Sequence, residues 1–406
     1  MGAASLDASG GVLPDTTRDA QRPPSGPPAG PAPAGGAPAG GAHVVRSLVS
    51  LVAIAAGWLA VTWVAGLRQG LLFVIGAGFG AVLAGAAFGF TTGWRVWLTQ
   101  RDPTGFLAQF LAIGLTSIVS IPLLASHTEL SGAAAPLSVS LVLGAFVFGA
   151  AMQLADGCGS GTLYKAGLGL PVSLAVFPAF VAGSFLGAAH QDAWLSLGAL
   201  PAVSLTDVLG AHATVLLQLA VLAAIATLLW SKRRTTTSRW QGRGVYVGAV
   251  LLAVFAIANL IVAGQPWGIV YGLGLWGAKL VSWAGVDLTA NAFWGREAQQ
   301  AQIAGSLLDD VTSVTNLGLL LGSFLFAWRR RAACPSVAPM ASAQWMWVIG
   351  AGLVLGYSAR LAFGCNVGAY FSGIASGSLH GWVWFACAFA GSMLGVRLRA
   401  RVGLKG

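Results

Sequence analysis

Charged residues are scarce in this chain of 406 residues. Asp, Glu, Lys and Arg make up 8% of the sequence, whereas a soluble globular protein carries about 25%. Hydrophobic residues make up 56%, and they gather in stretches of about 20, the length that crosses ~30 Å of hydrocarbon. This composition excludes a soluble enzyme and a secreted disulfide scaffold. It predicts an all-α polytopic membrane protein.

Cysteine and histidine are also rare. The four cysteines include no CxxC pair, which excludes a disulfide framework. None of the five histidines is paired with another inside an apolar stretch, which argues against haem, and no Ser-His-Asp set, P-loop or metal-ligand spacing is present. We therefore expect no cofactor, no metal and no enzymatic activity. Cys334, beside a basic cluster, and Cys387, in an apolar run, are expected to have only structural roles.

Basic residues outnumber acidic ones by 22 to 12, and most of the excess lies in three short clusters at 232–243, 329–331 and 397–405. Each cluster adjoins an apolar stretch. This pattern is typical of cytoplasmic loops under the positive-inside rule and does not require nucleic acid as a partner. We therefore expect a multi-pass protein of the cell inner (plasma) membrane, with the lipid bilayer as its surroundings.

The composition also divides the chain into segments. Residues 1–42 hold 8 of the 17 prolines and 9 glycines, a composition that favours disorder. Two membrane repeats are predicted at 43–230 and 244–400. A basic cytoplasmic linker at 231–243 joins them, and 401–406 form a C-terminal tail.

Parity of membrane crossings constrains the topology. The basic clusters at 231–243 and 329–331 should both be cytoplasmic, yet three apolar segments lie between them, so one segment must fail to cross. The glycine-rich segment 267–285, which carries Lys279, is the candidate, and glycine-rich 70–90 is its expected counterpart in the first half. If both are re-entrant, about nine transmembrane helices remain and the N-terminal tail lies outside. If 70–90 spans, the N-terminus lies inside.

An internal repeat supports two halves. The segment 144–164, GAFVFGAAMQLADGCGSGTLY, aligns with 351–371, AGLVLGYSARLAFGCNVGAYF, at a shift of 207 residues. The aligned identical pairs include Cys158 with Cys365 and their preceding glycines, Gly157 and Gly364. With the predicted topology, the repeats enter the membrane from opposite sides. Inverted repeats with broken helices are the common plan of transporters.

The Gly-Cys pairs mark the candidate site. Gly157 and Gly159 flank Cys158, and Gly364 and Asn366 flank Cys365. We expect the helix to break at each cysteine, forming a re-entrant segment, and a short half-helix to begin directly after it. Irregular backbone at membrane depth is tolerated where it lines a cavity or is buried in protein. The free N–H groups at the start of such a half-helix would favour a nearby anion or thiolate.

Ionisable residues inside apolar segments are expensive and are functional candidates. Arg360, five residues before Cys365, is expected to attract or pair with an anion. For Lys165, a contact with a ligand and a side chain that merely reaches the membrane interface are equally consistent with the sequence. Other polar residues nearby are Asp156, Ser160, Thr162, Tyr164 and Tyr370.

The motifs FGCNVGAYFSG, DGCGSGTLYKAG, FGFTTGWR and LWGAKL resemble the YeeE/YedE family of sulfur-transport membrane proteins, over roughly residues 44–400. The resemblance implies an hourglass-shaped protein that takes up thiosulfate or a related small sulfur-containing anion. It implies that Cys158 and Cys365 line the path and that a small cytosolic sulfur-carrier protein is a partner. Thiosulfate-transporting members have a further cysteine in an early re-entrant segment, where FGFTTGWR offers Thr91 and Thr92 instead. This departure leaves open a different sulfur compound as cargo.

The chemistry of the residues suits such a cargo. Thiosulfate is a compact dianion with a soft terminal sulfur, and a cysteine S–H can meet that sulfur as a weak donor. The sequence leaves open whether the thiols only hydrogen-bond or react as a persulfide relay. Two other classes stay open as well: a membrane thiol–disulfide or persulfide-handling redox protein, and a channel for another small solute.

Overall fold

The computed structural model describes residues 40–234, 244–330 and 340–404. The chain divides into two compact units, Met1–Val44 and Val45–Gly406, and all sites discussed below lie in the second unit. The predicted disordered tail, most of the linker 231–243 and Cys334 lie outside the described residues.

The described part is almost entirely helical. One small antiparallel sheet joins β1 to β2. The elements, in chain order, are α1 (Gly40–Ala65), α2 (Leu67–Gly85), α3 (Phe90–Gln100), α4 (Thr104–Ser126), β1 (Pro136–Ser138), α5 (Val139–Leu154), α6 (Gly159–Gly167), α7 (Pro171–Ala189), α8 (Gln191–Leu195), β2 (Ala199–Ala202), α9 (Leu205–Leu209), α10 (Ala211–Ser231), α11 (Gly244–Ala263), α12 (Val270–Trp283), α13 (Glu297–Ala304), η1 (Leu307–Asp309), α14 (Val311–Arg330), α15 (Ser342–Leu361), η2 (Asn366–Phe371), α16 (Ser372–Ala375) and α17 (Leu379–Arg401).

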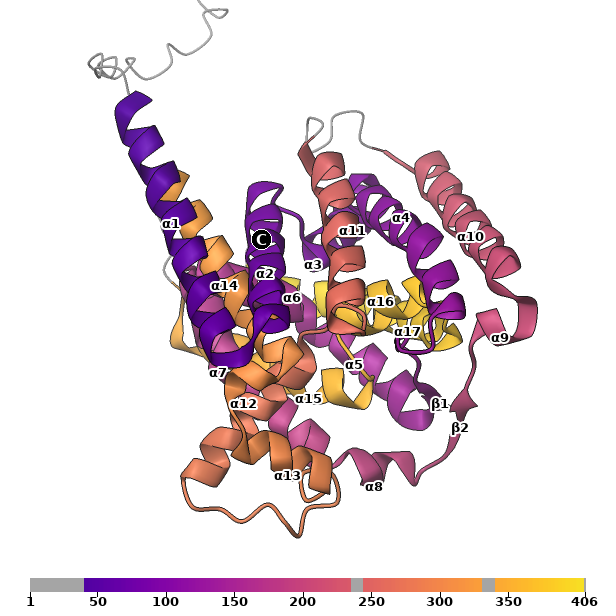
Figure 1. The fold of residues 1–406 in the computed structure, drawn as a ribbon. Helices are drawn as coiled ribbons and strands as arrows, with labels where there is room; N and C mark the ends of the chain where they lie inside the picture. The colour runs from indigo at the N-terminus through magenta and orange to yellow at the C-terminus, as the bar shows by residue number, and fades with distance from the viewer. Residues whose placement is uncertain (1–39, 235–243, 331–339, 405–406) are drawn as a thin grey trace, which may run out of the picture. The chain divides into compact units, whose positions relative to one another are not determined.

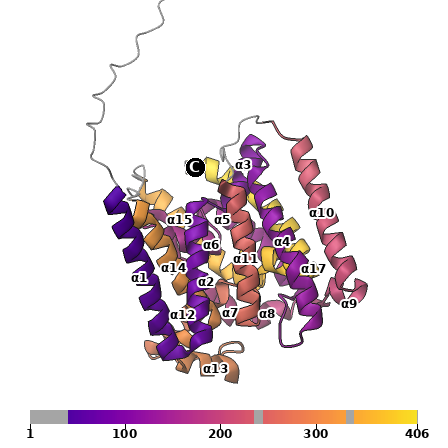
Figure 2. The same cartoon turned by 45° about the horizontal axis from the view of Figure 1, so that its top comes forward.

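Ten helical stretches in the described residues are long and apolar enough to cross a membrane. Three of them combine two or more elements across a break: Leu67–Gln100, Val139–Gly167 and Ser342–Ala375. The prediction of an all-α polytopic membrane protein is confirmed. The peripheral helix α10 fits this setting, because only Thr214, Gln218 and Leu222 of its residues are buried, and both views show it beside α4 (Figures 1 and 2).

The structure corrects the prediction that 70–90 is re-entrant. Residues Leu67–Gly85 form the continuous helix α2, which belongs to one of the ten candidate spans. Its glycines serve close packing rather than a break: a Cβ on Gly76 would lie 2.2 Å from the Thr315 carbonyl oxygen, and one on Gly80 would lie 2.1 Å from that of Leu319. The glycines of this segment therefore allow α2 and α14 to cross in close contact. By contrast, α12 is only 14 residues long and is not among the ten candidates, as expected for 267–285.

Two further helix pairs cross through glycines. Helix α5 packs on α17, where a Cβ on Gly149 would lie 1.9 Å from the Ala388 carbonyl oxygen. Helix α7 packs on α15, where a Cβ on Gly356 would lie 2.1 Å from the Phe180 carbonyl oxygen. The 207-residue shift relates α5 to α15 and α7 to α17. Exchanging the two halves of the chain therefore turns the α5–α17 pair into the α15–α7 pair. In the same way α3 contacts α4 and α17, and α12 contacts α14 and α7, so the counterpart of α12 is α3 rather than 70–90.

Candidate functional site

Three helix breaks in the membrane region share one backbone geometry. After α2, α5 and α15, a non-glycine residue adopts a left-handed conformation: Ala87 (φ 48°), Asp156 (φ 58°) and Phe363 (φ 58°). The next amide then bonds back to the last helical turn, which closes the C-terminus of each helix. Left-handed non-glycine residues cost about 1–3 kcal/mol each and persist where the surrounding structure requires them. The three bonds are Phe88 N to Leu83 O (3.0 Å), Gly157 N to Met152 O (3.2 Å) and Gly364 N to Ala359 O (2.8 Å).

Each of the two predicted cysteines stands at the N-cap of a short helix. Cys158 (φ −87°, ψ −169°) precedes α6, and Cys365 (φ −91°, ψ −168°) precedes the π-helix η2. The prediction that a half-helix begins directly after each cysteine is confirmed. The third break lacks a thiol, because Gly89 is the N-cap of α3.

The two breaks meet. A Cβ on Gly159, the first residue of α6, would lie 2.9 Å from the Sγ of Cys365. The backbone N–H groups of Val367 and Gly368 lie within reach of that sulfur, and so does the N–H of Ser160 from the other half-helix. Both cysteines are free thiols and fully buried. The start of α6 therefore touches the thiol that begins η2, and both half-helices direct N–H groups at one point.

Several polar side chains near these breaks are buried without hydrogen-bond partners. In the part of the chain that the structure describes, this holds for both amide atoms of Asn366, the hydroxyl of Tyr370, and the hydroxyls of Thr91 and Thr162. An unpaired buried polar group costs about 1–3 kcal/mol. Such groups close to the cysteines are suited to contact a polar cargo, because a cargo would supply the missing partners.

Aromatic rings enclose this region. The Tyr370 ring stacks on Trp384 at 6.2 Å between centroids and meets the edges of Phe90 and Trp94 at 6.3 Å and 5.7 Å. Phe90 and Trp94 belong to α3, the helix that follows the thiol-free break. Helix α3 therefore packs against the break that contains Cys365. The four rings are buried, so they shield the backbone of the second break from water.

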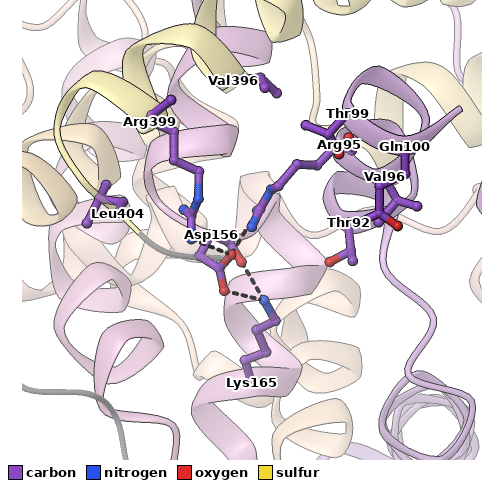
Figure 3. Close-up of a pocket in the computed structure, with 11 residues that line it drawn as sticks. Thr92, Arg95, Val96, Thr99, Gln100, Asp156, Lys165, Val396, Arg399 and Leu404 are labelled. Atoms are coloured by element: carbon purple, nitrogen blue, oxygen red, sulfur yellow. Dashed lines mark hydrogen bonds and ion pairs between the residues drawn. The ribbon is translucent and has the colours of Figure 1, made fainter. Parts of the chain in front are cut away.

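Two polar cavities flank the breaks. The first, of about 540 Å³, is lined by Gly368 of η2 together with Gln265, Tyr271, Gln302 and Asp310, and we call it the Gly368 cavity. The second, of about 470 Å³, is lined by Asp156 and Lys165 together with Thr92, Arg95 and Arg399, and we call it the Asp156 cavity (Figure 3). The break with Cys365 thus borders the first cavity, and the break with Cys158 borders the second.

Of the two predicted cations, Lys165 lines the Asp156 cavity, whereas Arg360 contacts a residue that lines the Gly368 cavity. Lys165 Nζ binds the Asp156 carboxylate at 2.8 Å. Arg360 donates to Gln191 Oε1 at 3.2 Å and stacks on the rings of Tyr271 and Phe293. Because Tyr271 lines the Gly368 cavity, Arg360 stands behind one of its walls. Its predicted attraction of an anion would act from there, through the field of its charge, and stays a prediction.

The predicted glycines are required by space or conformation. A Cβ on Gly157 would lie 2.9 Å from the Thr162 amide nitrogen. Gly364 has φ +152°, and a Cβ there would lie 2.7 Å from the Ala369 amide nitrogen. Together with Gly159 against Cys365, they allow the backbone to turn tightly beside the thiols.

The sequence did not predict Arg95 and Arg399 as site residues. Arg95 lies within the motif FGFTTGWR, and Arg399 lies in the basic cluster at 397–405. The signal that could have identified them is a charged residue near the end of a predicted membrane helix, opposite the one acidic residue of the first Gly-Cys motif. Only the packing of α3 and α17 against α5 and against each other brings these two arginines to Asp156.

Comparison with known proteins agrees with this architecture. A family model described as "Sulphur transport" matches residues 85–394. The chain is 27% identical over 332 residues to "Thiosulfate transporter TsuA" of Spirochaeta thermophila, which covers 76% of this chain and 92% of that protein. It is 25% identical over 340 residues to "Thiosulfate transporter TsuA" of Escherichia coli K12, covering 76% and 88%.

A shorter match links the chain to "Probable transporter YedE" of Escherichia coli K12, at 31% identity over 159 residues. That match covers 39% of this chain and 37% of the YedE protein. The resemblance to the YeeE/YedE family inferred from the Gly-Cys motifs is confirmed, since the family model spans most of the chain. The chain belongs to the sulphur-transport family of multi-pass membrane proteins.

Proposed function

We propose that the protein takes up thiosulfate or a related small sulfur-containing anion into the cytoplasm, along a path lined by Cys158 and Cys365. The observation that carries the proposal is the meeting of the two half-helix N-termini, each beginning at a buried free thiol, between two polar cavities. The family match and the names of the TsuA relatives support the choice of cargo.

The chemistry of the junction fits a sulfur oxyanion. Backbone N–H groups at a helix N-terminus favour negative charge, so they can receive the oxygens of the anion. A thiol S–H is a weak donor and sulfur is polarisable, so the two cysteines can contact a soft terminal sulfur in succession. In this scheme no covalent bond forms. Asn366 and the hydroxyls of Tyr370 and Thr91 supply further partners, and Thr91 stands in the motif where family members carry the additional cysteine.

The proposed orientation follows from charge. With ten spans, the segments at 101–103, 232–243 and 331–341 and the C-terminus fall on one side, and all four carry basic residues. This side is the cytoplasm in our proposal, and the N-terminal tail shares it. The two halves of the chain then run in opposite directions through the membrane. Cargo would enter by the Gly368 cavity and leave by the Asp156 cavity, where a cytosolic sulfur-carrier protein would receive it.

Uptake of radiolabelled thiosulfate in cells that lack other sulfur importers tests the proposal. We expect uptake above the empty-vector level for the wild type and for Cys387→Ala, whose side chain is partly exposed on α17. We expect Cys158→Ser and Cys365→Ser to lose uptake, because serine keeps the size of the side chain but removes the soft sulfur. Equal membrane levels of all four proteins are the control.

Wild-type uptake by both serine variants would remove the thiols from the mechanism. No thiosulfate uptake by the wild type, together with uptake of another sulfur anion, would change the cargo and keep the path. Trapping of a cysteine persulfide on Cys365 during turnover would replace hydrogen bonding with a covalent relay.

A further inference from the structure

Three cations surround a single carboxylate in the Asp156 cavity (Figure 3). Arg95 Nη2 lies 2.8 Å from Asp156 Oδ1, Lys165 Nζ lies 2.8 Å from Oδ2, and Arg399 Nη2 lies 3.5 Å from Oδ1. The three basic side chains are mostly buried, with 9–14% of their surface exposed. Among the lining residues that the structure describes, Asp156 is the only acid. Among these described lining residues, basic side chains thus outnumber acidic ones by three to one.

The backbone turn at Asp156 does not require a carboxylate at this position. Phe363 occupies the equivalent position of the second break, with the same φ of 58°. An apolar side chain therefore permits the same turn, and the charge of Asp156 is not needed to form it. The carboxylate instead holds three basic side chains in place beside the open space of the cavity.

Four separate elements build this cluster. Arg95 comes from α3, Asp156 from the break after α5, Lys165 from α6 and Arg399 from α17. Gln153 fixes both arginines: its side-chain oxygen accepts from Arg95 Nε at 3.1 Å, and its carbonyl accepts from Arg399 Nη1 at 2.8 Å. The cations are thus oriented before any ligand arrives, and a guanidinium is well shaped for bidentate binding of an oxyanion.

We propose that Arg95, Lys165 and Arg399 form a binding site for a small divalent oxyanion, with Asp156 as a permanent fourth member that reduces its affinity. The inference rests on the proposed uptake of a sulfur-containing anion and adds a second station for it, apart from the thiols. Three basic side chains around one cavity attract a dianion more strongly than chloride, because Coulomb attraction grows with the charge of the ligand. The negative charge of Asp156 repels the same ligand, so the anion binds and also leaves.

Thermal unfolding of the purified protein in detergent tests the site. The midpoint is measured in sodium thiosulfate, sodium sulfate and sodium chloride at equal ionic strength, which equalises screening. We expect the wild-type midpoint to rise in both divalent anions relative to chloride, since a ligand that binds only the folded state stabilises it. Lys165→Met and Arg95→Gln should abolish this rise. Cys365→Ala should keep the rise in sulfate, because the cluster does not include that thiol.

Asp156→Asn should bind sulfate about tenfold more tightly, because a competing charge has been removed. Its matched control is Asp192→Asn, which removes a half-buried carboxylate that is bound to Arg296 outside the cluster and should leave the sulfate response unchanged. If Asp156→Asn does not fold because the three basic side chains have lost their shared carboxylate, Lys165→Met decides the outcome, since it keeps Arg95, Arg399 and the carboxylate. An equal sulfate response in wild type and Lys165→Met would overturn the site.

Stabilisation by phosphatidylglycerol that soluble sulfate does not reproduce would assign the cations to a lipid headgroup and would also overturn the proposal. Failure of the site and failure of the proposed function are distinguishable. Thiosulfate uptake without a sulfate response refutes the site alone. A sulfate response without thiosulfate uptake refutes thiosulfate as the cargo and keeps the oxyanion site.

Discussion

Cys158 and Cys365 stand 207 residues apart in the chain and occupy the same backbone position in two helix breaks. Their φ values are −87° and −91°, and the residues two positions earlier both have φ 58°. The carbonyl of each cysteine accepts the amide N–H four residues later, at 2.8 Å and 2.9 Å. The repeat in the sequence is therefore a repeat of a structural device: a thiol at the start of a half-helix, held inside the protein.

The contact of Gly159 with the Cys365 sulfur leads to a first prediction. Gly159→Ala should abolish most uptake, because the new methyl group would lie 2.9 Å from Sγ and force the two breaks apart. Overpacking of this kind costs about 1–3 kcal/mol of stability. The measurement is uptake at equal membrane level, together with the thermal midpoint of the purified protein. Gly350→Ala in α15 is the matched control, since nothing lies within 4 Å of its Cβ; if Gly159→Ala transports as Gly350→Ala does, the close contact has no role.

The positions of the two cavities predict the order in which the thiols can be reached. Cys365 adjoins η2, whose Gly368 lines one cavity, and Cys158 adjoins α6, whose Lys165 lines the other. A membrane-impermeant thiol reagent added outside intact cells should therefore modify Cys365 faster than Cys158, and thiosulfate should slow that reaction. Both rates should be low because both thiols are fully buried. The rates are compared in two single-cysteine proteins by mass spectrometry, and faster modification of Cys158 would reverse the proposed orientation.

A topology with ten spans predicts which side of the membrane an inserted tag faces. A tag inserted after Gly198, in a segment without Lys or Arg, should be accessible from outside intact cells. Tags at 235–240 and at the N-terminus should become accessible only after the membrane is permeabilised. The N-terminal tag separates the two topologies, since nine spans would have placed it outside. The same accessibility for the tags at 198 and 235–240 would contradict both topologies.

Asp310 predicts a pH dependence of uptake. It lines the Gly368 cavity, and burial raises the pKa of its carboxyl above the ordinary range, although N–H groups of Ser313 and Thr312 and the charge of Lys279 oppose the shift. Because its pKa is higher in the folded protein than in the unfolded chain, the folded state binds the proton first as pH falls. Its contribution to stability therefore rises on acidification through the folded pKa and is lost as pH rises through it.

Protonation of Asp310 also removes a negative charge from the proposed entrance. Uptake of an anion should increase as the external pH falls toward the pKa of Asp310. Asp310→Asn should raise uptake at pH 7 by about two- to tenfold and flatten the pH profile. The asparagine oxygen can still accept the Ser313 N–H in the first turn of α14, as Asp310 Oδ2 does at 2.7 Å, but it carries no charge. Asp287→Asn is the control, because that carboxylate is exposed and its pKa is lowered by hydrogen bonds from Thr289. An unchanged profile in Asp310→Asn would assign the pH dependence to another group.

Much of the membrane architecture could be predicted from the sequence. The chain's apolar stretches of about 20 residues form helices such as α11 and α7, because a backbone in hydrocarbon must satisfy its hydrogen bonds within a helix. The break at each Gly-Cys pair was also predictable. Glycines that flank a cysteine inside an apolar run, repeated at a constant shift, mark a local backbone event that needs no long-range information.

The role of other glycines could not be predicted in this way. Gly76 and Gly80 suggested a re-entrant segment, yet they lie within the continuous helix α2 at its crossing with α14. A glycine that breaks a helix and one that admits a neighbouring helix look alike in a single sequence. The difference depends on what packs against them, which is a property of the assembled helices.

The sequence by itself determined the helical membrane class, the repeat and the two thiols at helix breaks, since these depend on hydropathy and on local backbone chemistry. Only the tertiary structure decided which side chains meet. It brought Gly159 against Cys365, and it gathered Arg95 and Arg399 around Asp156 from helices hundreds of residues apart in the chain. The physical reason is that electrostatic and packing contacts depend on distances in space of a few ångströms, and in a helical bundle those distances are set by how helices such as α3, α5 and α17 pack together.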